Sequence, residues 1–305
     1  MPGDVGTTQA NGITISYETF GELTDPPLLL IMGLGAQMIA WPDELCDLLV
    51  GGGYFVVRFD NRDAGLSTHL AELDAPSPVA VLARRSRPPY TVDDMADDAA
   101  GLLEALRIDS AHVVGASMGG FIAQAVALRH RKRVRSLSLI MTSTGSRLVG
   151  HPQPRVAARL ARRRPVLDRP AAIETAVETF RIIGSPGYPF DEGRIRELAG
   201  RSYDRAYDPA GVLRQLAAVT AQSDRTRQLH HLEMPTLVLH GMDDPLVGVS
   251  GGRAIARAVP GASFLGFPGM GHDLPRALWP QFSEAILATA AVGEARTAFG
   301  QTAGS

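Results

Sequence analysis

The sequence has very little cysteine, and its charges of opposite sign nearly cancel. Its single cysteine, Cys46, has no second thiol in the chain with which to form a disulfide, which excludes a fold held together by disulfides. The 30 lysine and arginine residues face 32 aspartate and glutamate residues, so the net charge is −2. Binding to nucleic acid requires a surplus of positive charge, so no nucleic-acid partner is expected.

Long hydrophobic runs are absent too. The longest apolar stretches, at residues 28–32 and 136–141, are far shorter than the ~20 residues that cross a bilayer. Residues 1–12 carry neither the basic start nor the apolar stretch that directs secretion. These absences predict a cytoplasmic protein without an integral membrane segment.

Apolar residues make up 45% of the chain, which is enough for a sizeable buried core. Their pattern predicts strands at residues 13–20, 28–32, 54–59, 111–115, 134–142, 236–240 and 263–267. It predicts helices at residues 43–50, 91–106, 118–129, 250–258 and 275–290, with Thr91 as the cap of the second. Strands that alternate with helices favour an α/β fold, in which helices cover both faces of a parallel sheet.

The alternation of strands and helices is interrupted between residues 143 and 227. This segment has helical stretches, many arginines and several prolines, but no convincing strand. It predicts an all-helical insertion, with residues 1–142 and 228–305 forming the α/β core. An insertion that follows the strand at 134–142 lies over the crevice where open α/β sheets bind ligands.

The segment 115–119, GASMG, carries the clearest chemical pattern. It matches G-x-S-x-G and stands between a predicted strand and a predicted helix, which is the context of a nucleophile elbow. The strained turn lifts the serine hydroxyl above the sheet, so Ser117 is predicted to be the nucleophile. An ordinary glycine-rich turn between a strand and a helix is the alternative interpretation.

A serine nucleophile needs a base and a group that orients the base. Of the eight histidines, only His272 lies late in the chain in a loop just after a predicted strand, and it is the expected base. The third member is expected between the two, at the end of the strand 236–240. Asp243 and Asp244 both stand there, and the residues alone leave the choice open.

The oxyanion of an acyl-transfer reaction needs two N–H donors. The backbone N–H of Met118, which follows the nucleophile, is one candidate. The loop after the strand 28–32 reads Gly-Leu-Gly, and the N–H of Leu34 is the other candidate. No cluster with the spacing of a metal site, no P-loop and no dinucleotide motif is found in the sequence, so no metal and no cofactor is expected.

With these residues assigned, the chain resembles the α/β-hydrolase superfamily over residues 10–292. Within it, the chain is most similar to the aclacinomycin methylesterase-type hydrolases and to related actinobacterial lipases and esterases. The matching motifs are WPDE at 41–44, RFDNRDAGLS at 58–67, VVGASMGG at 113–120, MDDP at 242–245 and PGMGH at 268–272. The resemblance implies a mostly parallel, doubly wound sheet with a helical cap, residues 143–227, inserted after the sixth strand.

The resemblance also assigns roles to individual residues. In this family the acid is the aspartate directly before the proline, which implies Asp244, and the first oxyanion donor corresponds to Leu34. The chain departs from many relatives at Met32, where they have histidine before the loop glycine; a thioether donates no hydrogen bond, so the loop must be supported from elsewhere. The D-x-R-D-x-G-x-S stretch is usually structural, which implies a scaffold role for the charged residues Asp60, Arg62 and Asp63.

The resulting prediction is a serine hydrolase that cleaves a carboxylic ester through an acyl-enzyme on Ser117, as a carboxylesterase or lipase acting on an apolar, small-molecule or lipid ester. A thioesterase, a phospholipase, a carbon–carbon bond hydrolase and a cofactor-free perhydrolase can share the triad, and a non-catalytic ligand-binding module is the alternative of another class. The cap could also touch an anionic lipid surface, or simply present a solvated face, through arginines at 155, 159, 162, 163, 164 and 169.

Overall fold

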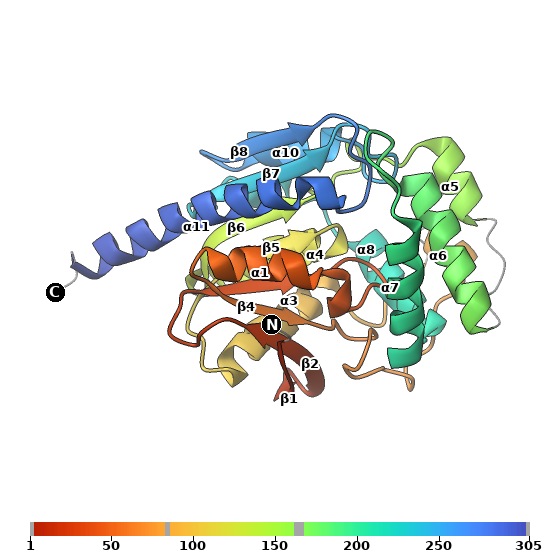
Figure 1. The fold of residues 1–305 in the computed structure, drawn as a ribbon, viewed down its shortest axis with the longest axis horizontal. Helices are drawn as coiled ribbons and strands as arrows, with labels where there is room; N and C mark the ends of the chain where they lie inside the picture. The colour runs from red at the N-terminus through yellow and green to blue at the C-terminus, as the bar shows by residue number, and fades with distance from the viewer. Residues whose placement is uncertain (1–2, 83–85, 162–167, 303–305) are drawn as a thin grey trace.

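The computed structural model describes residues 3–82, 86–161 and 168–302 (Figure 1). Within these ranges, eight strands form one sheet in the order β1-β2-β4-β3-β5-β6-β7-β8. The strands are β1 Asp4–Ala10, β2 Ile13–Phe20, β3 Pro27–Ile31, β4 Phe55–Phe59, β5 Ala111–Ala116, β6 Val134–Ile140, β7 Thr236–Gly241 and β8 Ser263–Phe267. The β1–β2 and β2–β4 pairs are antiparallel and all the other pairs are parallel, which confirms the predicted mostly parallel sheet.

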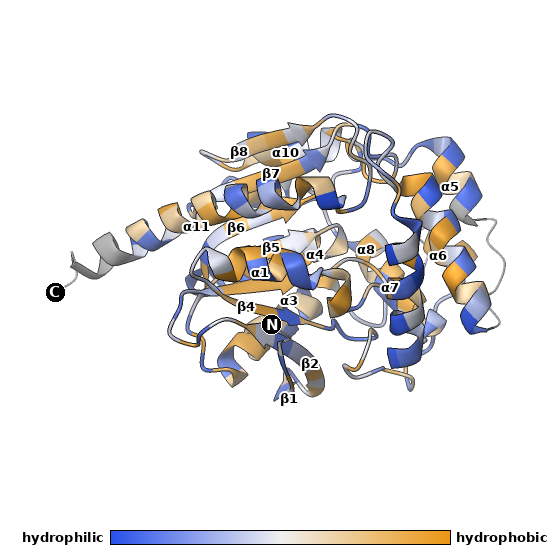
Figure 2. Ribbon diagram, viewed as in Figure 1, coloured by the Kyte–Doolittle hydropathy of each residue, from blue (hydrophilic) through white to orange (hydrophobic). Residues whose placement is uncertain are grey.

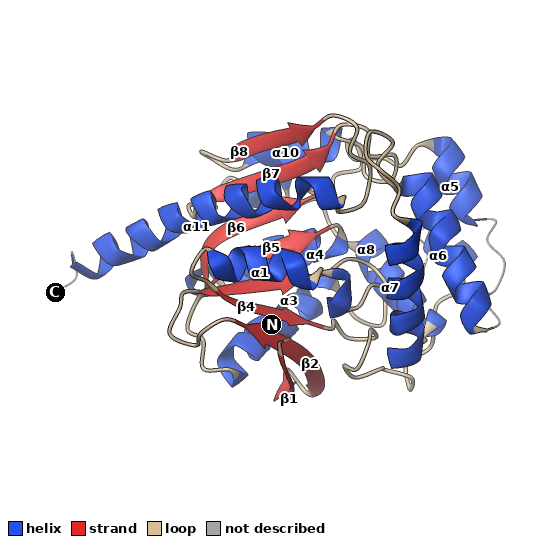
Figure 3. Cartoon of the chain, in the orientation of Figure 1, coloured by secondary structure: helices blue, strands red, loops and turns tan. Residues whose placement is uncertain are grey.

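Helices cover both faces of this sheet. Met95 of α3, Ile122 of α4 and Ile255 of α10 belong to the core cluster on one face. Leu45 of α1 and Phe282 of α11 belong to the cluster on the other. The helices of the core are α1 Asp43–Gly51, α2 Pro78–Leu82, α3 Val92–Ala105, α4 Met118–Arg129, α10 Ser250–Ala258 and α11 Trp279–Thr302, with 3₁₀ turns η1 Met38–Ala40, η2 Arg131–Arg133 and η3 Arg276–Leu278. The predicted doubly wound architecture is therefore confirmed (Figure 3).

Local sequence signals account for several of these boundaries, but not for all. Thr91 caps α3 as predicted: its hydroxyl accepts from the N–H of Asp94, whose carboxylate accepts from the N–H of Thr91. β1 was not predicted, because its largely polar and exposed residues show no apolar alternation and pairing with β2 holds it extended. α11 continues beyond the predicted end at residue 290 and reaches Thr302.

The connection between β6 and β7 is helical in all its described elements. It contains α5 Pro154–Ala161, α6 Arg169–Ile183, α7 Glu192–Arg205, α8 Pro209–Ala221 and α9 Thr226–Leu229. Helices α5, α6, α7 and α8 lie beyond the arrowheads of the parallel strands (Figures 1 and 3), so a helical cap after the sixth strand is confirmed. The division of the chain at residues 143 and 227 stays a prediction.

Helix α7 of the cap is more polar than the central strands of the sheet. In Figure 2, α7 is mainly blue, whereas β4 and β7 are mainly orange. On α5, Val156 is buried while Arg155 and Arg159 are exposed, and the predicted arginines at 162–164 lie outside the described residues. Among the helices in the described ranges, none combines the length and the apolar character that crossing a membrane requires.

Two aspartates in the loop after β4 tie the cap to the core. Asp63 accepts two hydrogen bonds from Arg214 of α8, both 2.8 Å long, and both side chains are almost completely buried. Asp60 forms an ion pair with Arg205 at the end of α7. Breaking a buried pair strands a charge away from water, which typically costs about 3–5 kcal/mol, so these contacts oppose displacement of the cap.

The third charged residue of this loop turns toward the core. Arg62 donates to both carboxylate oxygens of Asp98 in α3, at 2.6 and 2.7 Å. Asp60, Arg62 and Asp63 are all buried, and each is neutralised by a charge of the protein itself. This arrangement suits the scaffold role that the family resemblance implies.

His69 adds a titratable contact between core and cap. Its Nδ1 lies 2.8 Å from a carboxylate oxygen of Asp208, the residue that caps α8, and its Nε2 lies 2.9 Å from the carbonyl of Gly65. Both partners are acceptors, so both bonds form only when both ring nitrogens carry a proton. Burial disfavours the charged ring, but these two hydrogen bonds outweigh it and raise the pKa of His69 above its ordinary 6.5.

Replacing His69 by glutamine is expected to lower the free energy of unfolding most at acidic pH. A pKa that is raised in the folded state stabilises the fold fully below pH 6.5, and this contribution is lost as the pH rises through the raised value. Urea unfolding at about pH 6 and about pH 9 measures the effect, with His231→Gln at an exposed histidine as the control. An equal difference between wild type and His69→Gln at both pH values would mean that the ring carries no charge.

Candidate active site

The turn between β5 and α4 has the strained geometry of a nucleophile elbow. Ser117 has φ +54° and ψ −116°, a backbone conformation that residues other than glycine rarely adopt. A Cβ added at Gly119 would lie 2.0 Å from the carbonyl oxygen of Ile31, and one at Gly115 would lie 2.2 Å from the carbonyl oxygen of Gly119. Both positions therefore require glycine, which is the physical reason for the G-x-S-x-G spacing.

His272 contacts Ser117 with one ring nitrogen and Asp244 with the other. Its Nε2 lies 2.9 Å from Ser117 Oγ, and its Nδ1 lies 2.7 Å from Asp244 Oδ2. The backbone N–H of His272 donates to the carbonyl of Ile183 at the end of α6, at 2.7 Å. The structure thus brings three predicted residues, distant in the sequence, into one hydrogen-bonded chain, and a cap residue fixes the histidine backbone.

Asp243 and Asp244 point to different partners. One oxygen of Asp244 faces His272, while the other accepts from the N–H groups of Leu246 and Val247, both at 2.8 Å. Asp243 instead accepts from the N–H of Gly269, at 2.7 Å, in the loop that carries the histidine. The structure places Asp244, and not Asp243, beside His272.

His240 lies beside Asp244, and no pattern in the sequence singles it out. The ring is fully buried, and its Nε2 lies 2.8 Å from the carbonyl of Val247 and 3.7 Å from Asp244 Oδ2. Burial is the main reason that the pKa of His240 lies below its ordinary value. A neutral ring donates Nε2–H to the Val247 carbonyl and adds no positive charge next to Asp244, whose charge stays available to His272.

The two candidate oxyanion donors belong to segments next to Ser117. Met118 is the first residue of α4, so its N–H has no carbonyl partner in the preceding turn of the helix. The loop after β3 runs close to the serine, because a Cβ at Gly33 would lie 3.2 Å from the Cβ of Ser117. Leu34 follows directly, with a half-exposed side chain.

Because Met32 cannot donate a hydrogen bond to the loop after β3, this loop must be supported by other residues. Two amide side chains provide that support. Asn61 donates to the carbonyl of Met32 at 3.0 Å, and Gln215 of α8 accepts from the N–H of Gly35 at 2.8 Å. Neither residue was predicted to take part in the site. The motif RFDNRD contains Asn61, but no local pattern marks Gln215, which is 180 residues from its partner Gly35.

One group of side chains has the proximity of a metal site. Potential ligand atoms of Asp63, His69 and Asp208 lie within 4.8 Å of one another. Arg214 also donates to both aspartates, at 2.8 and 3.2 Å, and places its positive charge where a cation would sit. The donor set therefore suits an internal ion-pair network better than a metal ion.

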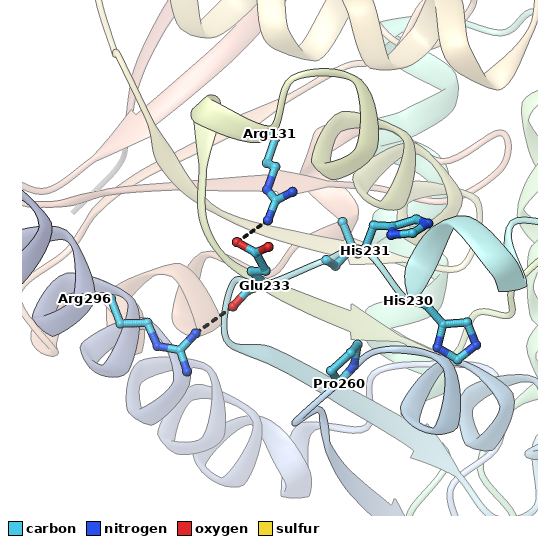
Figure 4. Close-up of a pocket in the computed structure, with 7 residues that line it drawn as sticks. Arg131, His230, His231, Glu233, Pro260 and Arg296 are labelled. Carbon is cyan, nitrogen blue, oxygen red and sulfur yellow. Dashed lines mark hydrogen bonds and ion pairs between the residues drawn. The ribbon is translucent and has the colours of Figure 1, made fainter.

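A surface hollow lies near the starts of the parallel strands β6 and β7. Figure 4 shows Arg131, which precedes β6, Glu233, which precedes β7, and Arg296 of α11 around it. Glu233 forms an ion pair with Arg131, and its carbonyl accepts from Arg296 at 2.6 Å. Arg131 and Glu233 stand before the strands that follow them, whereas Ser117 and Asp244 stand after theirs, so the hollow is not part of the triad region.

Comparison with known proteins gives the same architecture. The family model described as "alpha/beta hydrolase fold" matches residues 26–275. The rhodomycin D methylesterase DnrP of Streptomyces peucetius is 30% identical over 296 residues, which cover 90% of this chain and 94% of the relative. The 3-oxoadipate enol-lactonase 2 of Acinetobacter baylyi is 26% identical and covers 83% of this chain and 84% of its own.

Solved structures agree with this relationship. A hydrolase from Pseudomonas aeruginosa PA01 superposes with a TM-score of 0.68 at 25% identity. The match covers 94% of this chain and 98% of that one. The similarity therefore extends through the cap as well as the sheet.

Proposed function

This chain belongs to the α/β-hydrolase superfamily, with rhodomycin methylesterases among its relatives, and from that premise we propose that it is a serine hydrolase of carboxylic esters. One observation carries the proposal. Ser117 Oγ, on a strained turn, lies 2.9 Å from His272 Nε2, and Asp244 binds the other ring nitrogen at 2.7 Å. This is the arrangement in which a base takes the proton of a serine while a carboxylate orients the base.

Acylation begins when Ser117 Oγ attacks the ester carbonyl carbon and His272 Nε2 takes its proton. The carbonyl oxygen becomes an oxyanion, which the N–H groups of Leu34 and Met118 stabilise. The imidazolium is stabilised by Asp244 at its Nδ1–H. As the tetrahedral intermediate collapses, the bond to the alkoxy oxygen breaks, and His272 returns its proton to the leaving alcohol.

Deacylation repeats the same steps with water in place of serine. His272 Nε2 takes a proton from water as the water oxygen attacks the acyl carbon, and the oxyanion forms again between the same two N–H donors. Collapse breaks the bond to Ser117 Oγ, which regains its proton from His272, and the carboxylic acid leaves. The balance is one ester and one water consumed, one acid and one alcohol released.

The proposed substrate is a small-molecule ester of an apolar acid, with a methyl ester as the first class to test and the cytoplasm as the proposed compartment. Two of the relatives point to this chemistry, since one is named for a methyl ester and the other for an enol-lactone. The buried Asp63–Arg214 pair and the Asp60–Arg205 pair argue against a cap that lifts freely at a lipid surface. The carboxylesterase interpretation is thus favoured over the lipase and phospholipase interpretations.

Hydrolysis of p-nitrophenyl esters from acetate to palmitate, with and without detergent micelles, tests this proposal. We expect most activity on short chains and no activation by micelles. Methanol release from methyl esters of apolar acids is measured beside it, with Ser117→Ala as the blank. Preference for long chains with activation at micelles would overturn the closed-cap, small-ester interpretation.

Labelling with a fluorophosphonate tests the nucleophile separately. The folded protein is expected to gain one covalent adduct, located on Ser117 by peptide mass analysis. Labelling without ester turnover would move the substrate to a thioester or a carbon–carbon bond. A folded protein that forms no adduct would favour the non-catalytic ligand-binding module.

A further inference from the structure

Gln215 of the cap is bonded to the loop that carries a proposed oxyanion donor. Gln215 lies on α8, and its side chain is completely buried. Its Oε1 accepts from the N–H of Gly35 at 2.8 Å, and its Nε2 donates to the carbonyl of Arg62 at 2.7 Å. The partners fix the orientation of the amide, because a backbone N–H only donates and a carbonyl only accepts.

This bond acts on the peptide unit next to the donor. Gly35 has φ +66° and lies directly after Leu34, so the direction of the Gly35 N–H and the position of the Leu34 backbone are set together. α8 is also close to this turn, since a Cβ at Gly35 would lie 3.1 Å from a methyl group of Val212. The turn is therefore held by a polar bond and by an apolar contact from the same helix.

The helix itself is fixed to the core. Arg214, the neighbour of Gln215, makes the buried pair with Asp63. A Cβ at Gly211 would lie 2.8 Å from the Cβ of Asp63, so the start of α8 approaches the loop after β4 closely. Gln215 thus projects from a helix that is itself fixed to the core. A side chain can hold a loop in place only from such a rigid support.

We propose that Gln215 is a positioning residue for the oxyanion hole: through Gly35 it holds the Leu34 N–H where the oxyanion forms. The hole is then complete only while α8 is docked, which makes the cap part of the catalytic machinery as well as a cover. This inference rests on the proposed function, because it concerns the same acyl transfer. It assigns to the cap a contribution to turnover that is separate from substrate selection.

Gln215→Met tests the proposal, because methionine has a similar length but offers no comparable acceptor to Gly35. We expect kcat to fall about 10- to 100-fold, with KM within about threefold of wild type, because displacement of an oxyanion donor affects the transition state. The inhibition constant of a trifluoromethyl ketone, whose adduct with Ser117 carries an oxyanion, should rise by the same factor as kcat/KM falls. A kcat within threefold of wild type would overturn the proposal.

Two further variants separate positioning from general loss of structure. Gln215→Glu keeps an acceptor for the Gly35 N–H, and because burial favours the protonated carboxyl, its O–H can donate to the carbonyl of Arg62; this variant is expected to regain most of kcat. Gln37→Met is the matched control, since Gln37 is also buried and binds the carbonyls of Ser202 and Ala206 at the end of α7. Equal losses of kcat in Gln215→Met and Gln37→Met would indicate a merely structural role and overturn the proposal.

The folding of each variant and the reactivity of the wild-type serine are checked separately. Circular dichroism and thermal unfolding show whether each variant is folded at the assay temperature. If Gln215→Met does not fold, Gln215→Asn withdraws the acceptor from Gly35 while keeping a polar side chain, and the same kcat loss is expected. A wild-type protein that forms no adduct with a fluorophosphonate would refute the proposed function. An active wild type together with an unchanged kcat in Gln215→Met would refute this inference alone.

Discussion

Replacing Ser117 by alanine is expected to lower kcat for ester hydrolysis by about a million-fold. The methyl group leaves the elbow without a nucleophile, and no covalent acyl intermediate can form. Residual hydrolysis of about 10³- to 10⁴-fold above the rate in water is expected, because the oxyanion donors and the binding site remain. The comparison needs kcat for both purified proteins on the same p-nitrophenyl ester.

Ser283→Ala is the control for this loss. Ser283 is also a buried serine, but it lies on α11, where its hydroxyl donates to the carbonyl of Pro280. Its replacement is expected to leave kcat within a few-fold of wild type. If Ser117→Ala kept more than a tenth of the wild-type kcat, the nucleophile would have to be another group.

The strained turn that carries Ser117 was predictable from the sequence because its glycines lie within five residues. Gly115 is required by a contact within the strand–turn–helix unit, and Gly119 by the close approach of Ile31 in the neighbouring strand β3, so the two requirements leave glycines within one five-residue pattern. The apolar runs of the central strands are local signals as well, because burial on both faces requires them.

Other features were out of reach because they depend on the packing of distant segments. Gln215 is 180 residues from Gly35, and Arg214 is 151 residues from Asp63. The sequence of α8 has the same helical periodicity whether these two side chains face solvent or another loop of the protein. The edge strand β1, with polar residues and little burial, likewise takes its conformation from its partner strand rather than from an apolar pattern.

The choice between Asp243 and Asp244 shows where the limit lies. Both residues follow β7, and neighbouring side chains diverge according to the exact course of the turn. Two N–H groups, of Leu246 and Val247, draw Asp244 inward, while the N–H of Gly269 holds Asp243. The family resemblance identified Asp244, whereas the residues alone left both possible.

Replacing Asp244 by asparagine is expected to lower kcat about 10⁴-fold with little change in the fold. The reason lies in the hydrogen bonds of the side chain. Oδ1 accepts from Leu246 and Val247, so the carbonyl oxygen of an asparagine is held there and its NH₂ group faces His272 Nδ1. An NH₂ group only donates, so the ring must accept at Nδ1 and carry its proton on Nε2.

That tautomer cannot take the proton of Ser117, since the nitrogen that faces the serine is already protonated. The loss of activity is therefore expected even though every heavy atom stays in place. Asp243→Asn is the matched control: its amide oxygen can still accept from Gly269, and kcat is expected to stay within a few-fold of wild type. Measured kcat values that reversed this order would transfer the orienting role to Asp243. Comparable losses in both variants would mean that the loop carrying His272, rather than the tautomer of its ring, limits turnover.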